Sequence, residues 1–147
     1  MRKIKSQDLT SYRVTIKEMS KMVNRFNRDI LPYSNNYFTE WFDFVKNIPY
    51  EEDKFNEIIK RPKFIIEDFK GDCKKKSILI ASWCRAYGWE CRFIVSSTRQ
   101  DKGPHHIYTE IKNGKVWINA DATYKNGRIG KNLEKETYRE VWEWLTE

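Results

Sequence analysis

The chain has 147 residues, the length of one domain, and 39% of them are apolar and 15% aromatic. This composition excludes an intrinsically disordered chain, because it provides enough apolar side chains for a hydrophobic core. The formal net charge of +7 comes from 28 basic and 21 acidic residues that are mixed along the sequence. The mixing favours a basic soluble surface over a dedicated nucleic-acid-binding protein.

Apolar side chains at steps of three and four residues predict helices in the first part of the chain. This spacing predicts a helix over residues 15–31, which Pro32 ends, and a second helix over residues 36–48. A short third helix is expected over residues 51–60. Pro62 is then expected to close the helical part.

A further helix, over about residues 73–87, is predicted to lie inside the protein. Gly88 supplies its C-terminal stop. Between Ile78 and Tyr87 the helix is apolar on nearly every side, which is typical of a helix that is surrounded by other elements.

The second half of the chain favours a small antiparallel sheet. Residues 89–97 and 105–112 are expected to form strands, and Asn113-Gly114 is a hairpin signal that leads into a returning strand at 115–119. A last helix is predicted over about residues 134–146, from apolar residues that share one helical face. The order of elements is that of an α+β domain.

Gly71-Asp72-Cys73 lies where the buried helix is expected to begin. Gly71 allows a sharp turn, and Asp72 is a good helix N-cap. Cys73 then occupies the first helical position, where unpaired N–H groups and the helix dipole favour a thiolate. The cations of Lys74–Lys76 would act in the same direction. The alternative is that Cys73 is a small buried side chain, as free cysteines often are.

The other cysteines, Cys84 and Cys91, are expected to be core residues. Cys84 lies about 16 Å along the helix from Cys73, too far for a disulfide. Three cysteines without a Cys-x-x-Cys pair fit a reducing compartment. The N-terminus has no signal-peptide pattern, and the apolar run Ile78–Ala81 is too short to span a membrane. We therefore expect a cytoplasmic protein that does not enter a membrane.

The only two histidines, His105 and His106, are adjacent, so on a strand they point to opposite faces. One of them can serve a thiol as its base. Asp121 follows the predicted strand 115–119 and could orient an imidazole, although aspartate is also common in turns. A metal site of His106, Glu110 and Asp121 is a less favoured alternative. We expect no metal and no cofactor.

In this order, the motifs resemble those of the transglutaminase-like superfamily of cysteine enzymes, which is related in architecture to papain-like proteases. The resemblance implies a catalytic triad of Cys73, His106 and Asp121, and it selects His106 over His105 by its spacing to the residues that follow. The resembling residues are Gly71-Asp72-Cys73, Ala86-x-Gly88, His106-x-Tyr108-x-Glu110 and Trp117-x-x-x-Asp121-x-Thr123, within about Ile48 to Gly130.

The resemblance also implies the fold and the division of the chain. We expect one transglutaminase-like domain over residues 1–147, with N-terminal helices in 1–62 and a catalytic core in 63–147. The fold is expected to be papain/transglutaminase-like α+β, with a buried central helix that carries the cysteine.

A narrower likeness is to small transglutaminase-like proteins of bacteriophages and prophages, which implies a phage-encoded protein. Tyr50-Glu51-Glu52-Asp53 and Pro62, ahead of Gly71, look like a pattern of those proteins. The three lysines after Cys73 depart from it, because acidic residues are common there.

The implied activity is thiol-dependent acyl transfer through a thioester, by a peptidase or amidase or by a transglutaminase. The expected substrate is a peptide, protein or peptidoglycan-like amide, and Lys74–Lys76 suit an anionic one. The backbone N–H of Cys73 is a natural oxyanion donor, whereas the sequence indicates no second donor. The alternatives are an inactive binding or structural module on the same fold and a basic nucleic-acid-binding protein.

Overall fold

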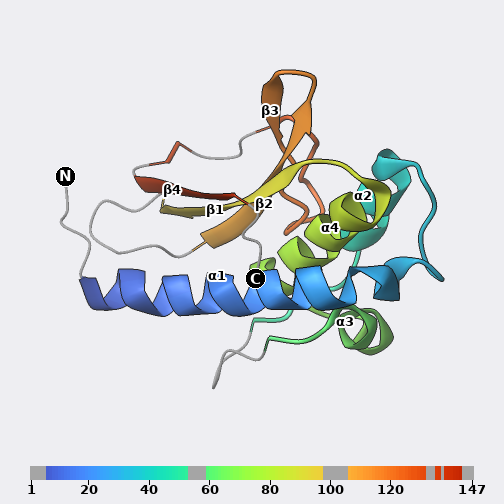
Figure 1. Ribbon diagram of the computed structural model, residues 1–147, viewed down its shortest axis with the longest axis horizontal. Helices are drawn as coiled ribbons and strands as arrows, with labels where there is room; N and C mark the ends of the chain where they lie inside the picture. The colour runs from blue at the N-terminus through green and yellow to red at the C-terminus, as the bar shows by residue number, and fades with distance from the viewer. Residues whose placement is uncertain (1–5, 53–58, 98–105, 132–134, 137, 144–147) are drawn as a thin grey trace.

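The computed structural model describes residues 6–52, 59–97, 106–131, 135–136 and 138–143. These residues form an α+β fold, which confirms the predicted fold class (Figure 1). The helices are α1 (Ser6–Phe26), the short 3-10 helix η1 (Asn27–Ile30), α2 (Phe38–Lys46), α3 (Pro62–Asp68) and α4 (Cys73–Tyr87). The strands are β1 (Cys91–Ser97), β2 (His106–Asn113), β3 (Val116–Asn119) and β4 (Tyr138–Glu143).

The four strands form one antiparallel sheet in the order β3-β2-β1-β4. Asn113 pairs with Val116, so the predicted hairpin is closed by a two-residue loop of Gly114 and Lys115. Gly114 has a φ of +64°, a conformation that glycine adopts without a steric penalty. The turn is therefore centred one residue later than Asn113-Gly114.

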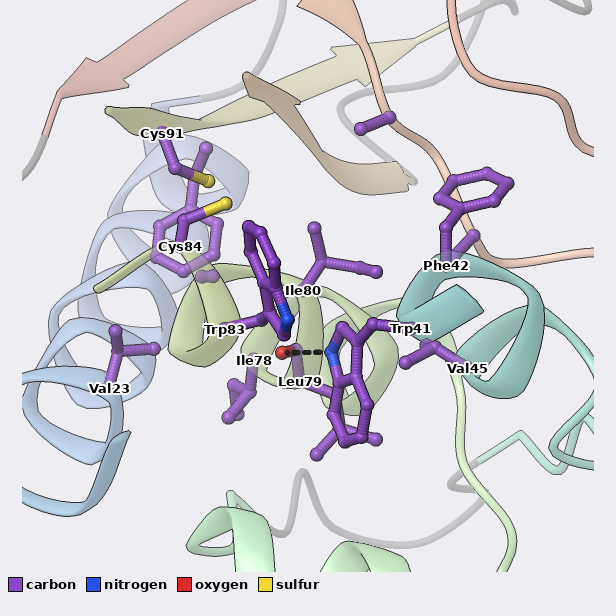
Figure 2. Close-up of a cluster of buried hydrophobic side chains, with 14 of the residues drawn as sticks. Val23, Trp41, Phe42, Val45, Ile78, Leu79, Ile80, Trp83, Cys84 and Cys91 are labelled. Carbon is purple, nitrogen blue, oxygen red and sulfur yellow. Dashed lines mark hydrogen bonds between the residues drawn. The ribbon is translucent and has the colours of Figure 1, made fainter. Parts of the chain in front are cut away.

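Helix α4 is the centre of the fold, as its apolar sequence predicted. It contacts β1 and β2 on one side and α1, α2, α3 and η1 on the others (Figure 1). Within the core, the Trp41 indole N–H donates to the Leu79 carbonyl at 3.0 Å, which ties α2 to α4 (Figure 2). Trp83 and Ile78 of α4 are fully buried. The core therefore fixes the position of the helix whose first residue is Cys73.

The ends of α4 follow from local signals. The Asp72 side chain accepts a hydrogen bond from the Lys75 backbone N–H at 3.1 Å, which is an N-cap. Gly88 ends the helix with a φ of +79°, and the Trp89 N–H donates to the Cys84 carbonyl at 2.8 Å. Both predicted ends of the helix are confirmed.

The predicted C-terminal helix over 134–146 is wrong, because residues 138–143 form strand β4. Tyr138, Val141 and Trp142 have helical spacing, which suggested one apolar face. In the strand, however, successive side chains point to opposite faces. Tyr138 and Trp142 therefore lie on the half-buried face, and Val141 lies on the exposed face. Strand β1 supplies the backbone hydrogen-bond partners of these residues. No local sequence pattern indicates this long-range pairing.

The N-terminal half differs from expectation in three places. Helix α1 begins at Ser6, earlier than the predicted residue 15. Residues 51, 52, 59 and 60 are not helical, and the rest of the predicted helix 51–60 lies outside the described residues. Pro62 opens α3 instead of closing the helical part, since proline at the first helical position loses no hydrogen bond. No helix within the described residues is long and apolar enough to span a membrane.

Candidate active site

Cys73 is the first residue of α4 and is 9% exposed. The turn that leads to it is held by the segment around Tyr50. The Gly71 N–H donates to the Pro49 carbonyl, and the Glu51 N–H donates to the Gly71 carbonyl, each at 3.1 Å. A Cβ atom on Gly71 would lie 2.9 Å from the Lys75 Cβ, so the helix start packs against a position that only glycine fits. The thiol is thereby fixed at the helix N-terminus.

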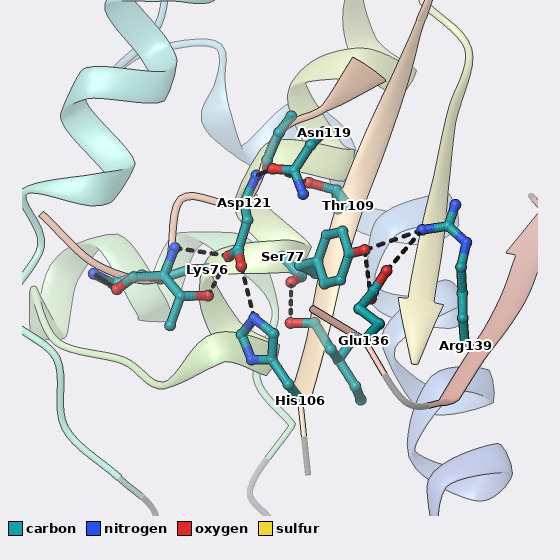
Figure 3. A network of polar contacts seen from close by, with 12 residues as sticks. Lys76, Ser77, His106, Thr109, Asn119, Asp121, Glu136 and Arg139 are labelled. Atoms are coloured by element: carbon teal, nitrogen blue, oxygen red, sulfur yellow. Dashed lines mark hydrogen bonds and ion pairs between the residues drawn. The ribbon is translucent and has the colours of Figure 1, made fainter. Parts of the chain in front are cut away.

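His106 is the first residue of β2, and strand alternation sets the direction of its side chain. Ile107 and Ile111 join the hydrophobic core, whereas His106 and Tyr108 lie on the other face of the strand. The Ser77 hydroxyl of α4 donates to the Ile107 carbonyl at 3.2 Å, which joins the helix to the strand beside His106 (Figure 3). The rings of His106 and Tyr108 stack at 5.5 Å.

Asp121 lies just after β3 and faces His106 (Figure 3). Its Oδ2 atom is 2.7 Å from His106 Nε2, and the two side chains are only 16% (His106) and 13% (Asp121) exposed. Its other oxygen, Oδ1, accepts hydrogen bonds from the Thr123 N–H at 3.1 Å and the Thr123 hydroxyl at 2.6 Å. The Asp121 N–H donates to the Asn119 side chain at 3.0 Å. Both carboxylate oxygens and the backbone N–H of Asp121 are therefore held by hydrogen bonds.

The electrostatics of the site favour a charged imidazolium. Burial alone would lower the pKa of His106, but its hydrogen bonds to Asp121 and to Cys73 raise that pKa to about 10. Burial would raise the pKa of Asp121, yet the hydrogen bond to His106 and those from Thr123 lower it. Since Asp121 takes Nε2 of the ring, Nδ1 is the nitrogen that is left for the Cys73 thiol. The three predicted site residues thus lie together.

Two exposed tyrosines lie beside these residues. Tyr50 and Tyr124 are 43% and 45% exposed, and their ring centroids are 5.5 Å apart. The Tyr124 ring also stacks on His106 at 6.4 Å. Burial and then the nearby Cys73 raise the pKa of Tyr50, so its hydroxyl remains neutral near the thiol. These tyrosines form an aromatic rim of the site, and spacing gave no signal for Tyr124.

The three lysines after Cys73 do not form one cationic group. Lys74 pairs with the N-cap Asp72, at 2.8 Å between its Nζ and Oδ2. Lys76 is instead 1% exposed, and its Nζ donates to the carbonyls of Thr123 at 2.9 Å and Lys46 at 3.3 Å. The sequence did not predict this burial, because a lysine in the first turn of a helix normally reaches solvent.

The remaining residues that the sequence analysis considered have other roles. Cys84 and Cys91 are buried in the core as predicted, and burial followed by a hydrogen bond to Cys84 raises the pKa of Cys91 (Figure 2). Glu110 is bound by Arg92 at 2.8 Å and Arg139 at 2.7 Å. Within the described residues, no three His, Cys, Asp or Glu side chains are placed to hold a metal. His105 lies outside the described residues.

Comparisons with known proteins agree with this architecture. The profile of the Transglutaminase-like superfamily matches residues 26–122, about two thirds of the chain. The fold is similar to the crystal structure of a candidate cysteine protease from Cytophaga hutchinsonii, with a TM-score of 0.50 and 19% identity. That match covers 86% of this chain, which spans 50% of the length of the other. No curated protein sequence matches significantly. The chain belongs to the transglutaminase-like superfamily.

Proposed function

We propose that the protein is a thiol-dependent acyl-transfer enzyme that uses Cys73 as nucleophile, His106 as base and Asp121 as the orienting carboxylate. The observation that carries the proposal is the 2.7 Å contact between His106 Nε2 and Asp121 Oδ2, which directs the other ring nitrogen toward Cys73. An imidazole held in one orientation beside a thiol at a helix N-terminus is the arrangement that activates a cysteine.

The reaction begins when the Cys73 sulfur attacks the carbonyl carbon of an amide. A C–S bond forms, and the carbonyl oxygen becomes an oxyanion that the Cys73 backbone N–H can stabilise. His106 holds the thiol proton and gives it to the leaving amine as the C–N bond breaks. Asp121 stabilises the imidazolium that exists between these proton transfers. The product of this half-reaction is a thioester on Cys73.

The second half-reaction decides between a peptidase or amidase and a transglutaminase. Water or a primary amine attacks the thioester while His106 takes its proton, and the thiolate leaves as the C–S bond breaks. We favour hydrolysis of a peptide, protein or peptidoglycan-like amide. Similarity in fold to the candidate cysteine protease from Cytophaga hutchinsonii supports this choice.

The experiment is a pair of assays on one acyl donor, a peptide that contains internal glutamine. Mass spectrometry follows cleavage or deamidation of the peptide, with and without a labelled primary amine. Hydrolysis that exceeds amine incorporation supports the amidase assignment, and the reverse supports a transglutaminase. Cys73→Ala should abolish both products, whereas Cys91→Ala should retain them because Cys91 is a core thiol.

Retention of either product in Cys73→Ala would reject Cys73 as the nucleophile. A chain that folds and binds such peptides but never forms product or a trapped thioester would be a binding module on the same fold.

A further inference from the structure

Lys76 is a buried cation whose presence the acyl-transfer chemistry does not explain. Its residue is 1% exposed, although it lies in the first turns of α4, one helical turn after Cys73. The charged groups that act on its ammonium are Asp121, which attracts it, and Lys125, which repels it. Burial lowers the pKa of Lys76 to about 8, so the amine is mostly charged at neutral pH.

The ammonium joins two segments that are distant in the sequence. It donates to the Lys46 carbonyl at 3.3 Å, at the last residue of α2, where the helix dipole attracts a cation. It also donates to the Thr123 carbonyl at 2.9 Å, in the segment after β3. Through Lys76, these two bonds connect the Thr123 backbone to α4 and to the end of α2.

Thr123 is also the residue that orients the carboxylate of the site. Its N–H and hydroxyl both donate to Asp121 Oδ1, at 3.1 Å and 2.6 Å, while Asp121 Oδ2 contacts His106. An unbroken series of hydrogen bonds therefore leads from Lys76 through Thr123 to Asp121 and His106. Every contact in this series lies within hydrogen-bond distance.

Burial of an ammonium has a desolvation cost of roughly several kcal/mol. The hydrogen bonds to its partners recover an amount of about the same order. A methionine of similar length would fill the same space without that cost. A residue that lowers the stability of the fold beside a reactive site is a sign of a functional role.

We propose that Lys76 is a positioning residue, which holds Thr123 so that Asp121 keeps His106 in line with Cys73. The inference rests on the proposed function and adds a residue to that site. It also accounts for one of the three lysines that depart from the phage-protein pattern.

The test compares Lys76→Met with Lys75→Met, which removes the same charge from the preceding residue of the same helix. Two properties are measured: the pKa of His106 by NMR titration, and the rate at which iodoacetamide alkylates Cys73 at pH 6. Loss of a cation alone would raise the pKa of His106. Loss of positioning lowers it, because the hydrogen bond to Asp121 weakens.

We expect the pKa of His106 to fall by about one unit or more in Lys76→Met, and the alkylation rate to fall about tenfold to 100-fold. Lys75→Met should leave both at the wild-type values. Lys76→Gln, which keeps an amide donor for one carbonyl, should move both in the same direction by less.

The proposal is overturned if the folded Lys76→Met or Lys76→Gln variant keeps the wild-type pKa of His106 and alkylation rate. It is also overturned if neither variant folds, since Lys76 is then a structural residue only. These results are distinct from a failure of the proposed function, which would appear as slow alkylation of Cys73 in the wild-type protein.

Discussion

Replacement of Asp121 by asparagine removes one charge from the site and keeps the shape of the side chain. The contact that changes is the 2.7 Å hydrogen bond between His106 Nε2 and Asp121 Oδ2, in which both side chains are largely buried. A charge-assisted hydrogen bond of this kind contributes about 1.5–3 kcal/mol, which corresponds to about one to two pKa units. The pKa of His106, about 10 in the wild type, should therefore fall to about 8 to 9 in Asp121→Asn.

NMR titration of the imidazole protons measures this directly, because the chain has only two histidines. His105→Gln identifies the resonance of His106. The same variant should turn over substrate at least about tenfold more slowly, since the imidazolium loses its stabilising partner. A pKa of His106 that stays at about 10 in Asp121→Asn would show that the carboxylate does not control the imidazole.

Three further predictions concern stability and the helix start. The folded pKa of His106 of about 10 lies above its ordinary value of 6.5, so its stabilisation is complete below pH 6.5 and is lost as pH rises through 10. Urea unfolding should show a loss of up to about 5 kcal/mol in the wild type and of about 2–3 kcal/mol in Asp121→Asn, whose His106 keeps a smaller pKa shift. Asp72→Ala should lower the free energy of unfolding in urea by about 1 kcal/mol, because the Lys75 N–H loses its cap. Gly71→Ala should slow alkylation of Cys73, since the new Cβ would lie 2.9 Å from the Lys75 Cβ and displace the helix start.

Each of these predictions has a contrary result. Equal loss of stability with pH in the wild type and in Asp121→Asn would mean that other groups govern the alkaline transition. An unchanged urea midpoint in Asp72→Ala would show that the cap does not stabilise α4. A Gly71→Ala protein with wild-type alkylation kinetics would mean that the turn before Cys73 tolerates a side chain.

The parts of the fold that the sequence predicted are those with local signals. Asp72 and Gly88 mark the two ends of α4, and both act within a few residues. Gly114 marks the hairpin for the same reason. Strand β4 was missed because its hydrogen bonds go to β1, and its alternating pattern also satisfied helical spacing over six residues.

The site residues likewise divide into those with local sequence signals and those that depend on contacts between distant segments. The helix position of Cys73 is a local property, whereas the choice of His106 over its neighbour came from the family spacing alone. The contact with Asp121 could be expected once β2 and β3 form a hairpin, because that pairing brings the two residues together. The burial of Lys76 depends on carbonyls of two distant segments, α2 and the residues after β3, so no sequence pattern could indicate it.

The most direct test of the proposed nucleophile is the rate and position of alkylation by iodoacetamide at pH 6. Free thiols are mostly protonated at that pH and react slowly, whereas a thiolate paired with the His106 imidazolium would react much faster. We predict stoichiometric modification confined to Cys73, with the buried Cys84 and Cys91 untouched as internal controls. Reaction of Cys73 no faster than a free thiol in the folded protein would contradict the assignment of this residue as an activated nucleophile.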